Sequence, residues 1–240
     1  MENVENMQTI KIAIDGPAGA GKTTISKELA RFFGFLYVDT GAMYRAVALK
    51  AIRNHINLND EDTITDMLET TSVNLKSTAD GGYQVLLDDE DVSSLIRTLD
   101  IATAASQVAT IQSVRIKLVE FQRKIAATDN VIMDGRDIGS YVLPHANIKI
   151  FLTATIEDRA VRRFKELQER GSATTFEQVK RDIKFRDKND SSRAFAPLMV
   201  ARDAMVVDTS DNSLDTSIEL LKEIIREKLY ELLYGAEANA

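Results

Sequence analysis

Several residue types are missing or scarce in this chain of 240 residues, and each shortage excludes a kind of chemistry. The absence of cysteine excludes disulfide bonds, thiolate metal sites and cysteine nucleophiles. Tryptophan is also absent, and the two histidines, His55 and His145, are expected in loops rather than as metal ligands. No apolar run approaches the roughly 18 residues that a membrane-spanning helix needs. Disulfide, thiolate and membrane-spanning functions are therefore not expected.

The charge balance is acidic rather than basic, with 37 Asp and Glu against 30 Lys and Arg and a formal net charge of −7. This balance argues against a protein that coats nucleic acid or an anionic membrane. Residues 1–6 are polar and acidic and do not resemble a secretory or transit peptide. With 44% hydrophobic and 28% charged residues, the composition is that of a globular protein. We therefore expect a cytoplasmic protein without a nucleic-acid or membrane partner.

Short apolar runs rich in valine and isoleucine alternate with helical patterns along the chain. The runs cover residues 10–15, 35–39, 131–134, 148–152 and 205–208. Runs of this length fit strands that are buried on both faces. Amphipathic helices are predicted over Lys22–Phe33 and along an apolar stripe from Leu214 to Leu232. Strands that alternate with helices predict an α/β fold with a parallel sheet covered on both faces.

One stretch departs from this alternation. Val73–Ser77 and Tyr83–Leu87 each alternate apolar and polar residues, and a glycine-containing turn over 78–82 separates them. This pattern predicts a β-hairpin. A hairpin within an α/β pattern indicates an insertion, which we place within residues 62–105. The end of the chain after Tyr234 is small and polar, and we expect it to be frayed.

A complete phosphate-binding motif, G-x-x-x-x-G-K-T, follows the first predicted strand and opens the first predicted helix. The loop and the start of the helix contain the residues expected to hold the phosphates of a nucleoside triphosphate: Gly16, Pro17, Ala18, Gly19, Ala20, Gly21, Lys22, Thr23 and Thr24. Glycines let successive backbone N–H groups converge on phosphate oxygens, and the helix N-terminus faces the same anion. Lys22 can bridge the β- and γ-phosphates, and the Thr23 hydroxyl can ligate Mg²⁺.

The rest of the chain narrows the type of reaction. It contains no N-K-x-D element for guanine, and Asp134 at a strand end is followed by Gly135 rather than by the Glu typical of many ATPases. Arginines are instead spread through the chain, and residues 159–193 hold 11 Lys and Arg against 6 Asp and Glu. Cations stabilise the charge of a transferring phosphoryl group. A phosphate acceptor is largely deprotonated at pH 7 and needs no general base, which fits the scarcity of histidine.

Five segments resemble those of bacterial cytidylate kinases, a family of P-loop nucleoside monophosphate kinases. They are Ile14–Lys22, Asp39–Arg45, Ala105–Ala109, Asp134–Gly139 and Arg193–Leu198. The resemblance covers roughly residues 8–230. It implies transfer of a phosphoryl group from ATP to CMP or dCMP with Mg²⁺, by an enzyme that is commonly monomeric.

The same resemblance implies a P-loop kinase fold: a parallel five-stranded sheet flanked by helices, a small β-containing insertion and a mobile lid. We expect a single domain over residues 1–234. Its core comprises roughly 8–61, 106–157 and 199–234, the insertion 62–105 and the lid 158–198.

The resemblance also implies roles for individual side chains. Residues expected around the acceptor phosphate and the transferred group are Arg45, Arg136, Arg186 and Arg193, with Lys22 as a catalytic residue on the donor side. Residues expected to read cytosine are Ser106, Arg115 and Asp137; Asp190 is expected at the sugar, and Thr40 stands where a serine is common. Arg159, Arg162 and Arg163 are expected on one face of a lid helix. Cytosine has an amino donor and two acceptors, so an Asp acceptor and Arg and Ser donors suit it.

Two alternatives remain open on the residues alone. A kinase of another small acceptor, such as an alcohol, would need a base, for which Asp39 or Asp134 is available. A nucleotide-dependent switch would bind a protein partner and would expose an apolar patch on its insertion. Asp39 and Asp134 could also orient Mg²⁺ through water, but an Asp at the end of a strand equally often caps a helix.

Overall fold

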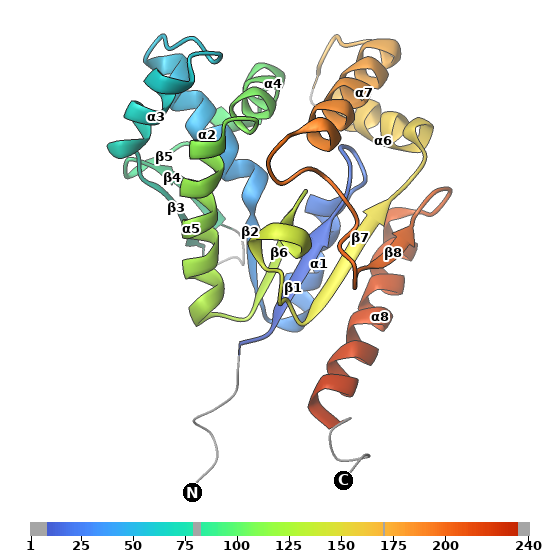
Figure 1. Ribbon diagram of the computed structural model, residues 1–240. Coiled ribbons are helices and arrows are strands. Elements are labelled where there is room, and N and C mark those ends of the chain that lie inside the picture. Colours follow the sequence, from blue (N-terminus) through green and yellow to red (C-terminus); the bar gives the residue numbers. More distant parts are fainter. Residues whose placement is uncertain (1–8, 79–82, 170, 235–240) are drawn as a thin grey trace, which may run out of the picture.

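The computed structural model describes residues 9–78, 83–169 and 171–234. At its centre is a parallel five-stranded sheet with the spatial order β2-β6-β1-β7-β8 (Figure 1). The strands are β1 (Lys11–Asp15), β2 (Leu36–Asp39), β6 (Val131–Gly135), β7 (Ile148–Thr153) and β8 (Met205–Asp208). Each strand lies within a predicted apolar run or extends it by one residue. The predicted α/β class with a parallel sheet is therefore confirmed.

Both faces of this sheet are covered, because successive side chains of a strand point to opposite sides. Ile12 and Ile14 of β1 join the apolar layer formed with α1 (Lys22–Phe33) and α8 (Leu214–Tyr234). Ala13, between them, packs on the other face, where α5 (Gln112–Thr128) and the π-helix η2 (Ile138–Val142) lie. Within the described residues, no helix combines the length and the apolar character that crossing a bilayer requires.

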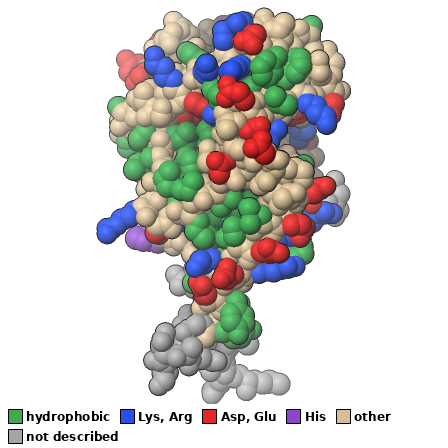
Figure 2. All heavy atoms as spheres, turned by 90° about the vertical axis from the view of Figure 1, so that its right-hand side faces the viewer, with side chains coloured by type: hydrophobic (Ala, Val, Ile, Leu, Met, Phe, Trp, Pro, Cys, Tyr) green, Lys and Arg blue, Asp and Glu red, His purple; other side chains and the backbone are tan. Residues whose placement is uncertain are grey.

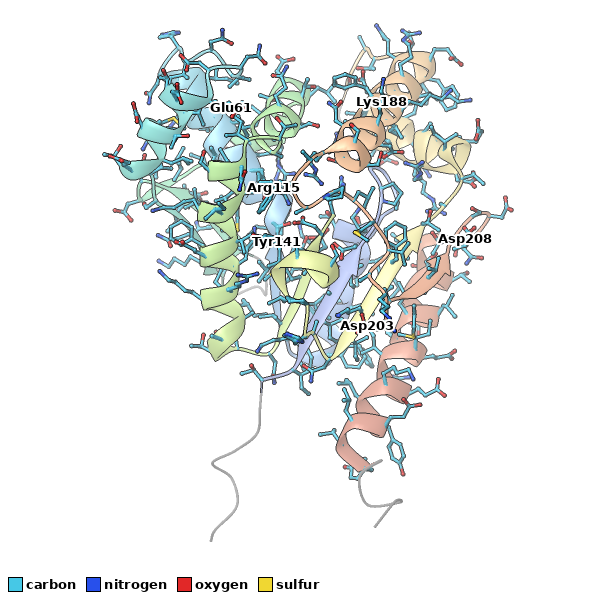
Figure 3. The ribbon with its side chains drawn as sticks, in the orientation of Figure 1. Glu61, Arg115, Tyr141, Lys188, Asp203 and Asp208 are labelled. Atoms are coloured by element: carbon cyan, nitrogen blue, oxygen red, sulfur yellow. The ribbon has the colours of Figure 1, made fainter. Side chains whose placement is uncertain are left out.

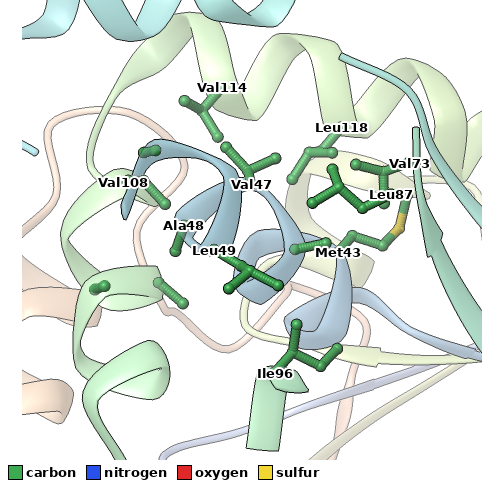
Figure 4. Close-up of a cluster of buried hydrophobic side chains, with 14 of the residues drawn as sticks. Met43, Val47, Ala48, Leu49, Val73, Leu87, Ile96, Val108, Val114 and Leu118 are labelled. Atoms are coloured by element: carbon green, nitrogen blue, oxygen red, sulfur yellow. The ribbon is translucent and has the colours of Figure 1, made fainter. Parts of the chain in front are cut away.

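The predicted insertion forms a second apolar core beside the sheet. This core combines α2 (Thr40–Arg53), which precedes the predicted insertion, with the elements that fall largely within it: α3 (Glu61–Glu69), β3 (Val73–Ser77), β4 (Tyr83–Leu87), β5 (Glu90–Asp91), η1 (Leu95–Arg97) and α4 (Leu99–Val108). β3, β4 and β5 pair in an antiparallel sheet, so the predicted hairpin is confirmed, although its turn at 79–82 lies outside the described residues. Met43, Leu87 and Leu118 are buried in this core, to which α2, β4 and α5 contribute (Figure 4).

The remaining helices, α6 (Ile156–Glu169) and α7 (Phe176–Ser192), form a separate pair at the end of the sheet (Figure 1). They share a small core made by Ala160, Leu167, Val179 and Ile183. This pair contains most of the segment that we expect to be the lid. The frayed end predicted after Tyr234 falls on residues 235–240, outside the described ranges.

The strand register brings three carboxylates to one edge of the sheet. Asp39 of β2 is the register partner of Asp134 of β6, and Asp134 is also the partner of Ile14 in β1. Asp15, the last residue of β1, therefore lies one position further along the same edge. Ligands of α/β sheets bind outside the carboxyl ends of the strands, so this edge is where the functional site is expected.

Candidate functional site

The phosphate loop joins β1 to α1 in a conformation that requires glycine. Gly16 has φ of 151°, and a Cβ there would lie 2.0 Å from the carbonyl oxygen of Leu152 in the neighbouring strand. Gly19 and Gly21 have φ of 77° and 84°, a region that side chains other than glycine rarely adopt. The predicted loop residues thus lie between the end of a buried strand and the N-terminus of a helix, where backbone N–H groups are available to an anion.

Lys22, the first residue of α1, is buried and donates from Nζ to the carbonyl oxygen of Pro17 at 2.7 Å. Burial and the nearby charge of Arg136 lower the pKa of this ammonium group. The hydroxyl of Thr23 donates to Oδ2 of Asp134 at 3.0 Å, while Thr24 is exposed. The lysine therefore lies folded against its own loop, beside the Thr23–Asp134 pair.

Oxygen ligands at this edge of the sheet fit a magnesium ion. The Thr23 hydroxyl and the Asp134 carboxylate are the kind of ligands that Mg²⁺ takes alongside nucleotide phosphates and water. Burial, followed by the charge of Asp39, raises the pKa of Asp134 to about 6. Asp39 caps α2, because its Oδ1 accepts from the Ala42 amide at 2.8 Å. Among the residues described, no group of three or more His, Asp or Glu side chains is arranged to hold a metal by itself.

The α6–α7 pair contacts the phosphate loop directly. Arg159 of α6 donates from Nη1 to the carbonyl oxygen of Ala18 at 2.8 Å and to Oδ2 of Asp187 at 2.6 Å. Asp187 of α7 in turn accepts from the Ala18 amide at 3.0 Å. Ala18 is thus held from both helices, and sequence reasoning did not identify Asp187.

The other two arginines predicted for the lid point elsewhere. Arg162 donates to the hydroxyl and the carbonyl oxygen of Thr209, which follows β8, at 3.1 and 2.5 Å. Arg163 pairs with Glu166, one turn further along α6, at 2.7 Å. Of the three, the contacts place only Arg159 against the phosphate loop.

A second group of charges forms around Asp190 near the end of α7. Arg136, which follows β6, donates from Nε to Oδ2 of Asp190 at 2.7 Å and from Nη1 to the Gly135 carbonyl oxygen at 3.1 Å. Arg193 donates from Nε to the Asp190 carbonyl oxygen at 3.2 Å. Its Nη1 lies 3.8 Å from the Asp190 carboxylate. The predicted sugar-contacting Asp190 therefore brings two of the predicted acceptor arginines together.

The three predicted cytosine-reading residues come from two helices and the loop after β6. Arg115, on α5, forms a buried ion pair with Asp137 and donates from Nη1 to the Ala109 carbonyl oxygen at 3.2 Å. The guanidinium carbon of Arg115 lies 5.6 Å from the ring centre of Tyr44. Figure 3 shows Arg115 projecting from α5 toward the middle of the molecule. The Ser106 hydroxyl on α4 is buried and has no hydrogen-bond partner.

Unpaired polar atoms are concentrated in these predicted residues. In the described part of the chain, the buried side-chain atoms without a hydrogen-bond partner are Ser26 Oγ, Arg45 Nε, Ser106 Oγ, Arg115 Nε, Gln122 Oε1, Arg186 Nε and Arg193 Nη2. Five of these seven belong to residues predicted to bind the acceptor nucleotide. A buried donor without a partner costs about 1–3 kcal/mol. A ligand that accepts hydrogen bonds would remove this cost.

Among these arginines, Arg186 has the positive charge that negatively charged groups of the protein neutralise least. It forms no ion pair with any residue that the structure describes. Burial and the neighbouring charge of Arg136 lower the pKa of its guanidinium to about 10. Excess positive charge at this point favours a bound anion.

The basic residues of the 159–193 segment are divided between the surface and the interior of the molecule. Figure 2, which views the side of the molecule with α6, α7, β8 and α8, shows basic and acidic side chains interspersed over this face. The side chains of Arg159 and Arg193 are only 8% and 4% exposed. The segment therefore contributes Arg159 and Arg193 to the interior, while its outer face carries both signs of charge.

Thr40 and several aromatic residues complete the site. The Thr40 hydroxyl donates to the carbonyl oxygen of Asp134 at 2.7 Å, so its proton is already used within the protein. Tyr37 donates to Oδ1 of Asp134 at 2.9 Å, and Tyr83 donates to Oδ2 of Asp39 at 2.7 Å. Sequence reasoning missed both tyrosines and Tyr44. The only available signal was that Tyr44 lies within the Asp39–Arg45 segment.

Comparisons with known proteins agree with this geometry. Residues 12–227 match the family described as cytidylate kinase. The chain is 48% identical over 233 residues to the cytidylate kinase of Caldicellulosiruptor bescii, which covers 97% of this chain and 99% of that protein. It is 49% identical over 210 residues to the cytidylate kinase of Pelotomaculum thermopropionicum, which covers 88% and 93%.

One solved structure has a similar overall fold. It is a crystal structure of an uncharacterized protein from Eubacterium ventriosum, with a TM-score of 0.51 and 16% identity over 92% of this chain and 99% of that chain. This likeness concerns the fold alone. The family match and the near-full-length relatives identify the chain as a phosphotransferase with the P-loop kinase fold. The chain belongs to the cytidylate kinase family.

Proposed function

We propose that the protein transfers the γ-phosphoryl group of ATP to CMP or dCMP and releases ADP and CDP or dCDP. A phosphate oxygen of the acceptor forms a bond to the γ-phosphorus, and the bond from that phosphorus to the bridging oxygen of ADP breaks. The observation that carries the proposal is the set of buried, unpaired Arg and Ser atoms. Arg136 connects this set to the phosphate loop, because burial and, after it, the Arg136 charge lower the pKa of both Arg186 and Lys22. A binding site for one phosphate-bearing nucleotide beside the donor loop explains why these atoms are left free.

On the donor side, the loop and Lys22 bind the phosphates of ATP. Among the described residues, the Lys22 ammonium donates a hydrogen bond only to the Pro17 carbonyl oxygen, from which the β- and γ-phosphates of ATP can draw it away. Arg159 donates to the carbonyl oxygen of Ala18 and Asp187 accepts from its amide, so side chains of α6 and α7 stabilise the conformation of the loop. Closing these helices over the loop excludes water, which would otherwise compete as the acceptor.

On the acceptor side, the arginines bind the monophosphate and orient it toward the γ-phosphorus. Arg45, Arg186 and Arg193 each have a buried side-chain nitrogen available, and Arg136 is held by Asp190. Because a guanidinium presents donors in a fixed fork, it suits both phosphate binding and the charge of the transferring group. The phosphate of CMP is largely ionised at pH 7, so no general base is required.

Base selection is assigned to Ser106, Arg115 and Asp137. The Asp137 carboxylate can accept from the amino group of cytosine, and the free Nε of Arg115 and the Ser106 hydroxyl can donate to its ring acceptors. Uracil has a carbonyl where cytosine has the amino group. Its carbonyl oxygen would face the Asp137 carboxylate, and neither group can donate a hydrogen bond to the other. Mismatched buried polar groups discriminate strongly between substrates.

Magnesium would be held by the Thr23 hydroxyl, with Asp134 orienting its water ligands. When bound, the ion neutralises charge on the β- and γ-phosphates. Asp134 already accepts from Thr23 and Tyr37, which fixes the orientation of its carboxylate. Because its pKa is raised to about 6, Asp134 is mainly ionised, as this role requires, only above about that pH.

The structure bears on both alternatives. A switch protein would expose an apolar face on its insertion, but Val85 and Leu87 of β4 are 2% and 3% exposed. An alcohol kinase would need Asp39 or Asp134 as a base, yet both carboxylates accept hydrogen bonds from protein donors. Neither observation favours an alternative over a nucleotide acceptor.

The test is release of ADP in the presence of magnesium and ATP, with CMP, dCMP, UMP, AMP and GMP supplied one at a time as acceptors. We expect CMP and dCMP to stimulate release strongly and the purine nucleotides not to do so. Stimulation by none of them would contradict the proposal and favour the switch. Equal stimulation by all five would contradict the base-reading assignment.

A further inference from the structure

Tyr83 of the insertion reaches into the main sheet. It is the first residue of β4, and its hydroxyl donates to Oδ2 of Asp39, at the end of β2, at 2.7 Å. Its ring lies edge-on to Tyr37 of β2, with ring centres 5.4 Å apart. The ammonium of Lys27 lies 5.3 Å from the centre of the Tyr83 ring. The Asp39 carboxylate thus links the insertion to the edge of the sheet at which the strands end.

The same carboxylate oxygen also holds an acceptor arginine. Arg45 donates from Nη2 to Oδ2 of Asp39 at 3.0 Å, and Oδ1 is used by the Ala42 amide. Burial alone would raise the pKa of Asp39, but Arg45, the Tyr83 hydroxyl and the Ala42 amide together hold that pKa below its ordinary value. Tyr83 and Arg45 therefore share the charge of a single buried oxygen atom.

Arg45 is only partly engaged by this contact. Its Nε is buried without a hydrogen-bond partner, although the side chain as a whole is 25% exposed. An arginine that binds phosphate must present its donors to the ligand rather than to a neighbouring carboxylate. The strength of the Asp39–Arg45 pair therefore affects how readily Arg45 binds an acceptor phosphate.

Tyr83 remains a hydrogen-bond donor throughout the working pH range. Burial and the adjacent Asp39 carboxylate raise the pKa of its hydroxyl above the ordinary value, so the phenol stays protonated. A donated hydrogen bond withdraws charge from the carboxylate oxygen that accepts it, which weakens the attraction of that oxygen for a second donor.

We propose that Tyr83 is a positioning residue for the acceptor phosphate, acting through Asp39 on Arg45. By donating to the oxygen that Arg45 also contacts, it keeps the Asp39–Arg45 pair weak enough for the guanidinium to turn to the phosphate of the nucleotide. This inference rests on the proposed function and extends it, because it gives the insertion a part in phosphate binding as well as in folding.

The test is Tyr83→Phe, which removes the hydroxyl and keeps the ring and its contact with Tyr37. We expect the KM for CMP to rise by about 3- to 10-fold, the range of one ordinary hydrogen bond, because the lost bond affects the phosphate only through Arg45. The KM for ATP and kcat should stay within about twofold of the wild type, because Asp39 contacts no residue of the phosphate loop in the described structure.

The decisive comparison repeats the change in a chain carrying Arg45→Met. If Tyr83 acts through Arg45, Tyr83→Phe should leave the already raised KM for CMP unchanged in that background. Tyr37→Phe is the contrasting variant within the aromatic pair, since its lost hydrogen bond falls on Asp134 instead of Asp39. Because Asp134 is assigned to magnesium, Tyr37→Phe should change the dependence of turnover on magnesium and ATP rather than the KM for CMP.

Two outcomes would overturn the inference while the proposed function stands: wild-type turnover of CMP with an unchanged KM in Tyr83→Phe, or an equal rise in KM with and without Arg45. A merely structural role for Tyr83 would give the second outcome. Failure of the wild type to turn over CMP would instead refute the proposed function itself, and the inference with it.

Discussion

The donor and acceptor halves of the site differ in how their polar groups are satisfied. In the donor half, Lys22 contacts the Pro17 carbonyl oxygen, Thr23 contacts Asp134, and Arg159 contacts Ala18 and Asp187. In the acceptor half, buried nitrogen or oxygen atoms of arginines and of Ser106 have no partner. In the described structure, these side chains of the donor half have partners within the protein, whereas several side-chain atoms of the acceptor half do not.

This difference follows from how each half is built. The phosphate loop is one segment, and its anion site consists mainly of backbone N–H groups that the fold places at the helix N-terminus. The acceptor half collects side chains from α2, α4, α5, α7 and the loop after β6. Holding such groups preorganised and unpaired lowers stability, and the bound nucleotide then supplies the missing partners.

The largest effect is expected from Lys22→Ala in the donor half. The charge that Lys22 brings to the transferring phosphoryl group is lost, so kcat should fall by about 10²- to 10³-fold. The fold should survive, because the lysine side chain makes a single hydrogen bond, to Pro17. The assay is ADP release with saturating CMP, and unchanged turnover would refute a catalytic role for Lys22.

A smaller effect is expected from Ser106→Ala in the acceptor half. Loss of one donor to cytosine should reduce the preference for CMP over UMP, measured as the ratio of the two kcat/KM values, by about tenfold. The KM for ATP should not change.

Ser26→Ala is the matched control, because Ser26 is also buried with an unpaired hydroxyl but lies on α1, among the residues covering the other face of the sheet. An equal loss of preference in both variants would contradict the assignment of Ser106 to the base.

The smallest effect is expected where the two halves meet. Asp15 accepts from the amides of Ile138 and Gly139 at 2.8 and 2.7 Å and so ties the donor strand to the loop that carries Asp137. Burial raises the pKa of Asp15 from its ordinary value of 3.8 to about 6. The folded protein therefore binds more protons than the unfolded chain in this window, and stability from this group is lost as the pH rises.

Asp15→Asn removes this titration. Between about pH 5 and pH 7, the free energy of unfolding of the wild type should fall relative to that of the variant by about 1 kcal/mol. Urea unfolding of both proteins at the two pH values measures this difference. A constant difference between the proteins would show that Asp15 does not titrate in this range.

The features that could be predicted from the sequence are those that a short segment specifies. The glycines of the loop, the buried strands and the β3–β4 hairpin each leave a local pattern, and all were placed correctly. The contacts of Asp187 with Ala18 and of Tyr83 with Asp39 join residues distant in the chain, and no local pattern marks them.

Arginine orientation shows the same limit. Arg159 and Arg162 are three residues apart on α6, yet one contacts the phosphate loop and the other the turn after β8. Their spacing predicts a shared side of the helix but not which neighbour each long side chain contacts. Packing of α6 against both the loop and β8 decides this, and packing depends on the whole fold.

The most direct test of the difference between the two halves compares the variants Arg186→Met and Arg159→Met. For each variant, the free energy of unfolding and the turnover of CMP are measured on the same protein sample. Arg186 is short of partners, so its replacement should raise the free energy of unfolding by about 1 kcal/mol while kcat/KM for CMP falls by about 100-fold. Arg159 donates three hydrogen bonds within the protein, to Ala154, Ala18 and Asp187, so its replacement should lower stability. Loss of stability in Arg186→Met together with unchanged turnover would contradict the account.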